Sequence, residues 1–133
     1  MDNQAHKFTI QQVAETTGLS VYTLRYYERI GLIHHIGRIE NTHRRYSSDD
    51  IGWIEFLNKL RATGMSIQQM TAYAELQRLG EASLPERLEM LKAHQQVVEE
   101  HMRELHDYLN VICYKIGIYQ EIVDEQKALI ASP

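Results

Sequence analysis

Cysteine, proline and glycine are scarce in this chain of 133 residues. The single cysteine, Cys113, excludes an intrachain disulfide and supplies too few thiolates for a cysteine-built zinc site. The two prolines and seven glycines form no low-complexity tract. No apolar run approaches the roughly 20 residues of a membrane span, and the polar start, "MDNQAHKFTI", lacks the apolar region of a signal peptide. The simplest expectation is a globular, cytoplasmic protein that does not enter a membrane.

Positive charge is not in excess over the whole chain, whose net charge is −4, but it is concentrated. Residues 65–133 carry eleven Asp or Glu and six Lys or Arg. Residues 1–64 carry seven Asp or Glu and eight Lys or Arg. Residues 22–46 alone contain five arginines, two glutamates and three histidines. Since a phosphate responds to charge within a Debye length of about 8–10 Å, this local excess is compatible with nucleic-acid binding.

Five helices are predicted from residues that commonly cap helix starts. A Ser or Thr side chain there accepts a hydrogen bond from a first-turn N–H, and a Gln or Glu three residues later completes a capping box. The expected caps are Thr9 with Gln12, Ser20, Ser47 or Ser48 before Asp49 and Asp50, Ser66 with Gln69, and Ser83 with Glu86. Between the second and third helices, alternation at residues 32–36 and turn-forming Gly37 and Asn41 predict a two-stranded hairpin.

The last helix carries the clearest pattern of the chain, an apolar repeat in alternating steps of four and three residues. Such a 3.5-residue repeat is typical of a coiled coil, and too little chain remains to bury so long a helix within one bundle. We therefore expect a homodimer, whose seam is formed by Leu91, Val98, Met102, Leu105, Leu109, Ile112 and Ile116. Gln95 stands at an a position, where a polar residue often sets the register.

The first two helices are joined by a tight turn at Gly18, which favours a helix-turn-helix. On the second helix, wound at about 100° per residue, four side chains share one outward arc: Tyr22, Arg25, Tyr26 and Arg29. Arginine forks match guanine edges and phosphates, and tyrosine hydroxyls donate to phosphates. With Arg38, Arg44 and Arg45 in the hairpin, this pattern favours DNA binding over a merely solvated surface. Glu28 falls on the inward arc and is expected to pair with a basic or polar group.

The stretches "LSVYTLRYYERIGLI" and "NTHRRYSSDDIGWIEFLNKLRATGMSIQQM" resemble the MerR family of bacterial transcriptional regulators. The resemblance is close over residues 7 to about 80 and extends to the long dimerisation helix. It implies a mainly α fold, in which a winged helix-turn-helix domain with a small β-hairpin wing precedes a long antiparallel coiled-coil helix. The implied boundaries are residues 1–80 for the DNA-binding domain, 81–126 for the dimerisation helix and 127–133 for a short tail.

The resemblance also implies a mechanism and a set of contacts. Dimers of this family bind pseudo-palindromic operators between promoter elements that are spaced too far apart, and they bend and untwist the DNA for RNA polymerase. Arg25 would face bases, and Tyr22 would tune operator choice. Tyr26, Tyr27, Arg44 and Arg61 would contact phosphates, although a packing role for Tyr27 stays open. The full expected DNA-binding set is Tyr22, Thr23, Arg25, Tyr26, Tyr27, Arg29, Arg44, Arg45, Arg61 and Ser66.

The signal to which such a regulator would respond, a stress or a small molecule, is left open by the sequence. Metal sensors of the family carry cysteines after the dimerisation helix and multidrug sensors append a further domain, whereas this chain has "IVDEQKALIASP". Thiol-reactive members carry a cysteine in the third helix, where this chain has none. Cys113 is therefore either a sensor thiol or a small residue packed at the seam. His94 and His101 are seven residues apart, which favours a solvated flank over a metal pair.

The sequence leaves three alternatives to an effector-responsive regulator. One is a constitutive repressor without an effector, and another is a coiled-coil adaptor that has lost DNA binding. The third is an enzyme, but no phosphate-binding glycine loop, activated nucleophile or metal triad is recognisable, so no catalytic residue, cofactor or metal is expected.

Overall fold

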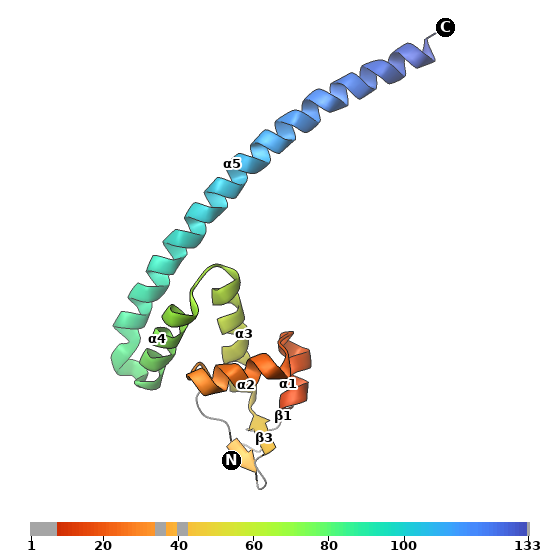
Figure 1. Ribbon diagram of the computed structural model, residues 1–133. Helices are drawn as coiled ribbons and strands as arrows, with labels where there is room; N and C mark the ends of the chain where they lie inside the picture. The colour runs from red at the N-terminus through yellow and green to blue at the C-terminus, as the bar shows by residue number, and fades with distance from the viewer. Residues whose placement is uncertain (1–7, 34–36, 40–42, 133) are drawn as a thin grey trace. The chain divides into compact units, whose positions relative to one another are not determined.

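The computed structural model describes residues 8–33, 37–39 and 43–132, with the backbone alone for residues 37–39, 43 and 44 (Figure 1). The elements in order are β1 (Phe8–Thr9), α1 (Ile10–Thr17), α2 (Val21–Ile30), β2 (Gly37–Ile39), β3 (His43–Tyr46), α3 (Ser48–Ala62), α4 (Ile67–Arg78), the short 3-10 helix η2 (Gly80–Ser83) and α5 (Leu84–Ala131). They form two units, Met1–Lys92 and Ala93–Pro133. The mainly α fold with a hairpin wing and a long last helix is confirmed.

Helices α1 and α2 begin at the residues that the sequence predicts, and the turn between them lies at Gly18 as expected. The Thr9 hydroxyl accepts from the backbone N–H of Gln12 at 3.1 Å, and the Gln12 side chain accepts from the Thr9 N–H at 2.8 Å. Ser20 caps α2 by accepting from the N–H of Thr23 at 3.0 Å. Between the helices, Gly18 has a φ of 79°, a left-handed conformation that L side chains rarely adopt. These local interactions account for the tight turn of the helix-turn-helix.

The wing is the hairpin of β2 and β3, and a third strand extends it into a small antiparallel sheet. The strand order is β1-β3-β2, with Phe8 opposite Tyr46 and Arg38 opposite Arg44. The predicted hairpin is confirmed, although the expected turn residue Asn41 lies outside the described residues. Gly37 was expected in a turn, and this was wrong: it lies in the edge strand β2, where a glycine is tolerated, and pairs with Arg45 of β3.

Helices α3 and α4 close the core of the first unit. Ser47 caps α3 by a capping box with Asp50, and Ser66 caps α4 by a capping box with Gln69, both as expected. Buried side chains from α1 to α4, from β3 and from the segments after α2 and after α3 form one cluster: Val13, Leu24, Tyr27, Leu32, Ile33, Tyr46, Ile54, Leu57, Leu60, Met65, Met70 and Ala74. This continuous core holds α2 with one face against the other helices and the opposite face in solvent.

The start of α5 differs from the expectation. Ser83 was predicted to form a capping box with Glu86, and this was wrong, because η2 runs directly into α5 and Ser83 is buried. Its hydroxyl donates to the carbonyl oxygens of Leu76 and Gly80 and accepts from Arg87 Nε at 2.9 Å. Ser83 therefore ties α5 to the end of α4 instead of capping the helix.

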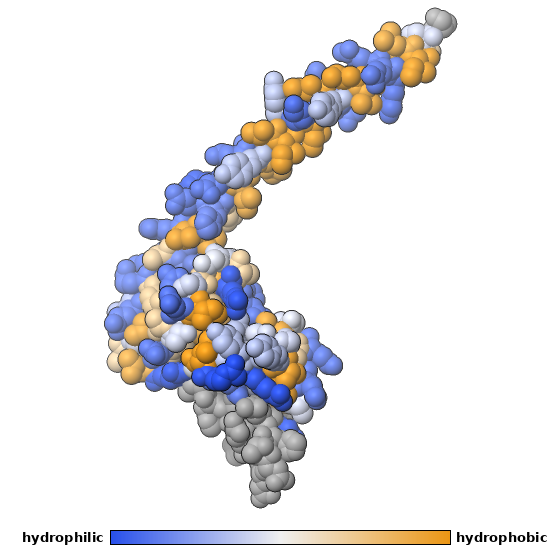
Figure 2. All heavy atoms as spheres, in the orientation of Figure 1, coloured by the Kyte–Doolittle hydropathy of each residue, from blue (hydrophilic) through white to orange (hydrophobic). Residues whose placement is uncertain are grey.

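Helix α5 is 48 residues long, about 72 Å at 1.5 Å per residue, and ends at Ala131. It continues beyond the expected boundary at residue 126 because the residues there, "QKALIA", favour helix. None of its residues is buried, and Figure 2 shows hydrophobic side chains exposed along it. Within the described residues, no helix is both long and apolar enough to cross a membrane.

Candidate nucleic-acid interface

The outward face of α2 gathers the side chains that helical geometry places there. Tyr22 is 76% exposed, and Arg25 and Arg29 are also exposed, while Tyr26 is half-buried. The Arg29 guanidinium carbon lies 5.5 Å from the centre of the Tyr26 ring, a cation–π arrangement that orders the two side chains. This face therefore presents two guanidinium groups and two phenol rings within three turns of helix.

The opposite face of α2 belongs to the core, and Tyr27 lies on it. Leu24 is fully buried, and Tyr27 is 2% exposed with its ring 6.1 Å from that of Tyr26. The Tyr27 hydroxyl accepts a hydrogen bond from Arg61 Nη1 of α3 at 2.9 Å. The geometry favours a packing role for Tyr27 over a direct phosphate contact. Its hydroxyl holds the exposed Arg61 side chain.

Glu28 has the polar partner that its inward position requires. The hydroxyl of Tyr46, a fully buried residue of β3, donates to Glu28 Oε2 at 3.4 Å. The expectation that Glu28 pairs with a polar group is confirmed. This contact connects α2 to the wing.

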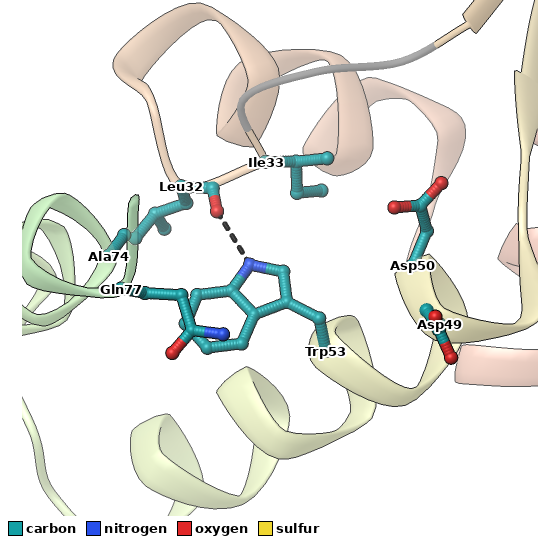
Figure 3. Close-up of a pocket in the computed structure, with 7 residues that line it drawn as sticks. All are labelled: Leu32, Ile33, Asp49, Asp50, Trp53, Ala74 and Gln77. Atoms are coloured by element: carbon teal, nitrogen blue, oxygen red, sulfur yellow. Dashed lines mark hydrogen bonds between the residues drawn. The ribbon is translucent and has the colours of Figure 1, made fainter. Parts of the chain in front are cut away.

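The segment between α2 and the wing is held by two further hydrogen bonds. Trp53 Nε1 of α3 donates to the carbonyl oxygen of Leu32 at 2.8 Å (Figure 3), and Arg78 of α4 donates to the carbonyl oxygen of Gly31. The indole ring is stacked on Tyr73, with ring centres 5.9 Å apart and planes inclined by 13°. The start of the segment that follows α2 is thereby fixed to α3 and α4.

A hollow lies beside Trp53, with about 550 Å³ of empty space that includes open solvent. Figure 3 shows the residues that line it: Leu32, Ile33, Asp49, Asp50, Trp53, Ala74 and Gln77. Asp50 already accepts from the Ser47 N–H at 2.9 Å in the cap of α3, and Asp49 occupies the first turn of the same helix. The two carboxylates are therefore accounted for by the helix N-terminus that they stabilise.

The remaining residues expected to contact DNA lie in the first turn of α2, in the wing, in α3 and at the start of α4. Thr23 lies in the first turn of α2, where its hydroxyl accepts from the Ser20 hydroxyl at 3.0 Å. Arg44 and Arg45 lie in β3, and the Arg45 side chain is half-buried. Arg61 and Ser66 are exposed, at the end of α3 and the start of α4.

Most of the expected seam residues are exposed on α5. Met102, Leu105, Leu109, Ile112 and Ile116 are each between 51% and 66% exposed, and Val98 is half-buried. Leu91 is different, because it packs against the core of the first unit. Cys113 is an exposed free thiol.

The sequence did not predict the residues that fix α2 and the segment after it to the rest of the domain. Tyr46, Trp53 and Arg78 make their hydrogen bonds to partners 18, 21 and 47 residues away in the chain. No periodicity or spacing in a single sequence indicates such pairs. Arg61 was expected to contact DNA, but its hydrogen bond to the Tyr27 hydroxyl was not predicted.

Comparison with known proteins gives one consistent result. Residues 8–77 match the family model described as MerR HTH family regulatory protein. An uncharacterised HTH-type transcriptional regulator of Haemophilus influenzae is 35% identical over 114 residues, covering 86% of this chain and 84% of that protein.

Two solved structures extend the likeness. The crystal structure of HiNmlR, a MerR family regulator lacking the sensor domain, bound to promoter DNA, has a TM-score of 0.79 at 35% identity, covering 86% of this chain and 90% of that one. A putative MerR family transcriptional regulator from Listeria monocytogenes has a TM-score of 0.85 at 34% identity, covering 92% and 93%.

Proposed function

Because this chain belongs to the MerR family of helix-turn-helix regulatory proteins, we propose that it is a transcriptional regulator that binds promoter DNA as a homodimer. It is not an enzyme. The similar protein HiNmlR, whose crystal structure contains promoter DNA, supports DNA as the ligand.

The observation that carries this proposal is the outward face of α2. Arg25 is exposed, and within the described residues no hydrogen bond or ion pair occupies its guanidinium group. A free bidentate donor on an exposed helix face suits the O6 and N7 acceptors of guanine in the major groove. Tyr22, 76% exposed one turn earlier, extends the same face toward a neighbouring base pair.

The surrounding residues would hold the DNA backbone. Tyr26 and Arg29 flank the reading face and would donate to phosphates, as would Arg44 and Arg45 in the wing. The exposed N-terminus of α4 at Ser66 offers backbone N–H groups to another phosphate. Arg61 would contact a phosphate while its guanidinium is held by the Tyr27 hydroxyl, so that Tyr27 acts as a positioning residue.

Dimerisation would supply the second recognition helix. The exposed apolar repeat of α5 supports pairing with another copy of the chain, which matches two copies of α2 to a pseudo-palindromic operator. In this proposal the operator lies in an overlong promoter spacer, and the bound dimer bends and untwists it so that RNA polymerase engages both promoter elements.

Selection from a pool of random duplexes tests DNA binding directly. The wild-type protein is expected to enrich an inverted repeat whose affinity falls steeply with salt. Recovery of no sequence, together with the absence of any salt-dependent complex, would instead support a coiled-coil adaptor that has lost DNA binding.

A regulator without an effector is the second candidate. It is favoured by the 35% identity to HiNmlR, a protein described as lacking the sensor domain. Transcription in vitro from the selected promoter separates the two candidates. A constitutive repressor lowers the transcript level without any added molecule at every spacer length, whereas the proposed activator raises it only on an overlong spacer.

A further inference from the structure

Two glutamines interrupt the apolar stripe of α5. Gln95 occupies an a position of the heptad repeat, and counting onward places Gln126 at a d position. Every a and d residue between them is apolar or aromatic: Val98, Met102, Leu105, Leu109, Ile112, Ile116, Tyr119 and Val123. The stripe therefore contains one polar position near each end.

The stripe is open in the single chain. Leu105 is 66% exposed and Ile112 is 56% exposed, and Figure 2 shows such hydrophobic side chains along the helix. A continuous apolar stripe with strict a and d spacing is narrow, which suits a single partner helix with the same spacing. A second copy of α5 has that spacing, so the stripe is complementary to itself.

The two glutamines distinguish one register from the others. In an antiparallel pair each a residue faces a d residue, and the possible registers differ by one heptad. In one register Gln95 faces Gln126 of the second copy, and every other layer between them is apolar or aromatic. A shift of one heptad places Gln95 opposite Tyr119, and a shift the other way places Gln126 opposite Met102.

The hydrogen-bonding groups agree with the first register. Gln95 Nε2 donates to Glu99 Oε2 at 3.2 Å along the same helix, which leaves its carbonyl oxygen to accept from the amide of Gln126. Beside the pair of Gln95 and Gln126, at e positions of the heptad, Glu99 faces Gln120 of the second copy. Gln120 Nε2 donates to Asp124 Oδ1 at 3.0 Å along its own helix, and its second N–H can donate to the carboxylate of the facing Glu99. A shift by one heptad in either direction places the Gln126 amide opposite an apolar side chain, Leu88 or Met102, which cannot pair with its N–H and carbonyl groups.

We propose that two copies of this chain pair antiparallel along α5 in the register that places Gln95 opposite Gln126, and that these two amide pairs fix that register. The inference rests on the proposed homodimer and names the contacts that build it. It also places Leu105 opposite Ile116, and Leu109 opposite Ile112, at the centre of the interface.

Cysteine cross-linking tests the register, in a Cys113→Ser background with oxidised glutathione as the electron acceptor. The variant Leu105→Cys/Ile116→Cys is expected to form a covalent dimer, because its two positions face each other and are too far apart on one helix to close within a chain. Val98→Cys/Ile116→Cys is the matched control, because these two positions face each other in the register that places Gln95 opposite Tyr119. Leu105→Cys alone is the control for a parallel pair, in which the residue would face its own copy.

The outcomes separate failure of the register from failure of the dimer. Covalent dimer in the first variant alone supports the proposal, whereas preferential cross-linking of either control overturns it. Light scattering under reducing conditions comes first. A monomeric wild-type protein at micromolar concentration would overturn the homodimer itself, and a dimer that cross-links in another pattern would overturn only the register.

A second measurement does not depend on the introduced cysteines. Gln95→Leu leaves the facing Gln126 amide without its partner and is expected to raise the dimer dissociation constant roughly tenfold. The double variant Gln95→Leu/Gln126→Leu is expected to recover wild-type affinity or better, since both positions become apolar. Two independent, additive effects would show that the glutamines do not face each other and would overturn the proposal.

Discussion

Arg61 Nη1 donates a hydrogen bond to the hydroxyl oxygen of Tyr27 at 2.9 Å, which links the end of α3 to the inner face of α2. Tyr27 is 2% exposed, whereas Arg61 lies in solvent. A buried ring thus positions an exposed cation beside α2. The bond gives Tyr27 an indirect role at the proposed interface that differs from a direct phosphate contact.

Replacing Tyr27 by Phe tests this role. The ring and its packing are kept, so the free energy of unfolding should change little, but Arg61 loses the group that orders it. We expect affinity for all duplexes to fall about 2–10-fold, the cost of ordering one long side chain on binding. In an Arg61→Ala background the same substitution should have no further effect. An equal loss in both backgrounds would indicate that the Tyr27 hydroxyl contacts DNA itself.

The turn at Gly18 should be sensitive to any side chain. Its φ of 79° is strained for an L residue, while a Cβ there would meet no atom within 4 Å, so the cost is in the backbone alone. Gly18→Ala should lower the free energy of unfolding by about 1–2 kcal/mol in a denaturant titration.

Gly52→Ala is the matched control for that substitution. A Cβ at Gly52 also meets nothing, but the residue lies inside α3, where Ala is favoured by about 1 kcal/mol. The control should therefore stabilise the protein. Equal effects of the two substitutions would contradict the assigned strain at Gly18.

The helix starts could be predicted from the sequence because their interactions are local. Thr9 and Gln12, or Ser66 and Gln69, satisfy each other within one turn, so their spacing contains the needed information. Ser83 shows the limit of this reasoning. Its sequence also fits a capping box, but its hydroxyl donates to the carbonyl oxygens of Leu76 in α4 and Gly80 in η2. The contact with Leu76 depends on how η2 packs against the end of α4.

The candidate site divides in the same way. The outward face of α2 follows from the helical period, and the structure confirms that Tyr22, Arg25 and Arg29 are exposed together. The contacts behind this face, such as Tyr46 to Glu28 and Trp53 to Leu32, join residues far apart in the chain. They depend on the assembled core, and so does the third strand β1, whose two residues are too few to form a recognisable pattern.

Charge placed in the middle of the proposed seam should separate the subunits. Leu105 and Leu109 are 66% and 51% exposed in the single chain, so replacing both by Glu should leave its fold intact while preventing association. Light scattering should report a monomer, and operator affinity should fall sharply because one recognition helix is lost. A persistent dimer would show that the seam lies elsewhere.

Arg44 of the wing should act on the DNA backbone irrespective of sequence. Arg44→Ala is expected to weaken all duplexes similarly and to reduce the slope of log affinity against log salt by about one. Lys115→Ala, on α5, removes the same charge as a control and should leave the slope unchanged. An effect of Arg44→Ala confined to one operator sequence would argue against a phosphate contact.

The central claim, that the outward face of α2 reads operator DNA, is tested most directly with Arg25→Ala. Its equilibrium affinity should be compared with that of the wild type on the selected operator and on operators changed at one base pair at a time. The account predicts that the variant loses about 1–3 kcal/mol of discrimination at one position in each half-site and keeps it at the others. Wild-type discrimination at every position of the operator would contradict the account.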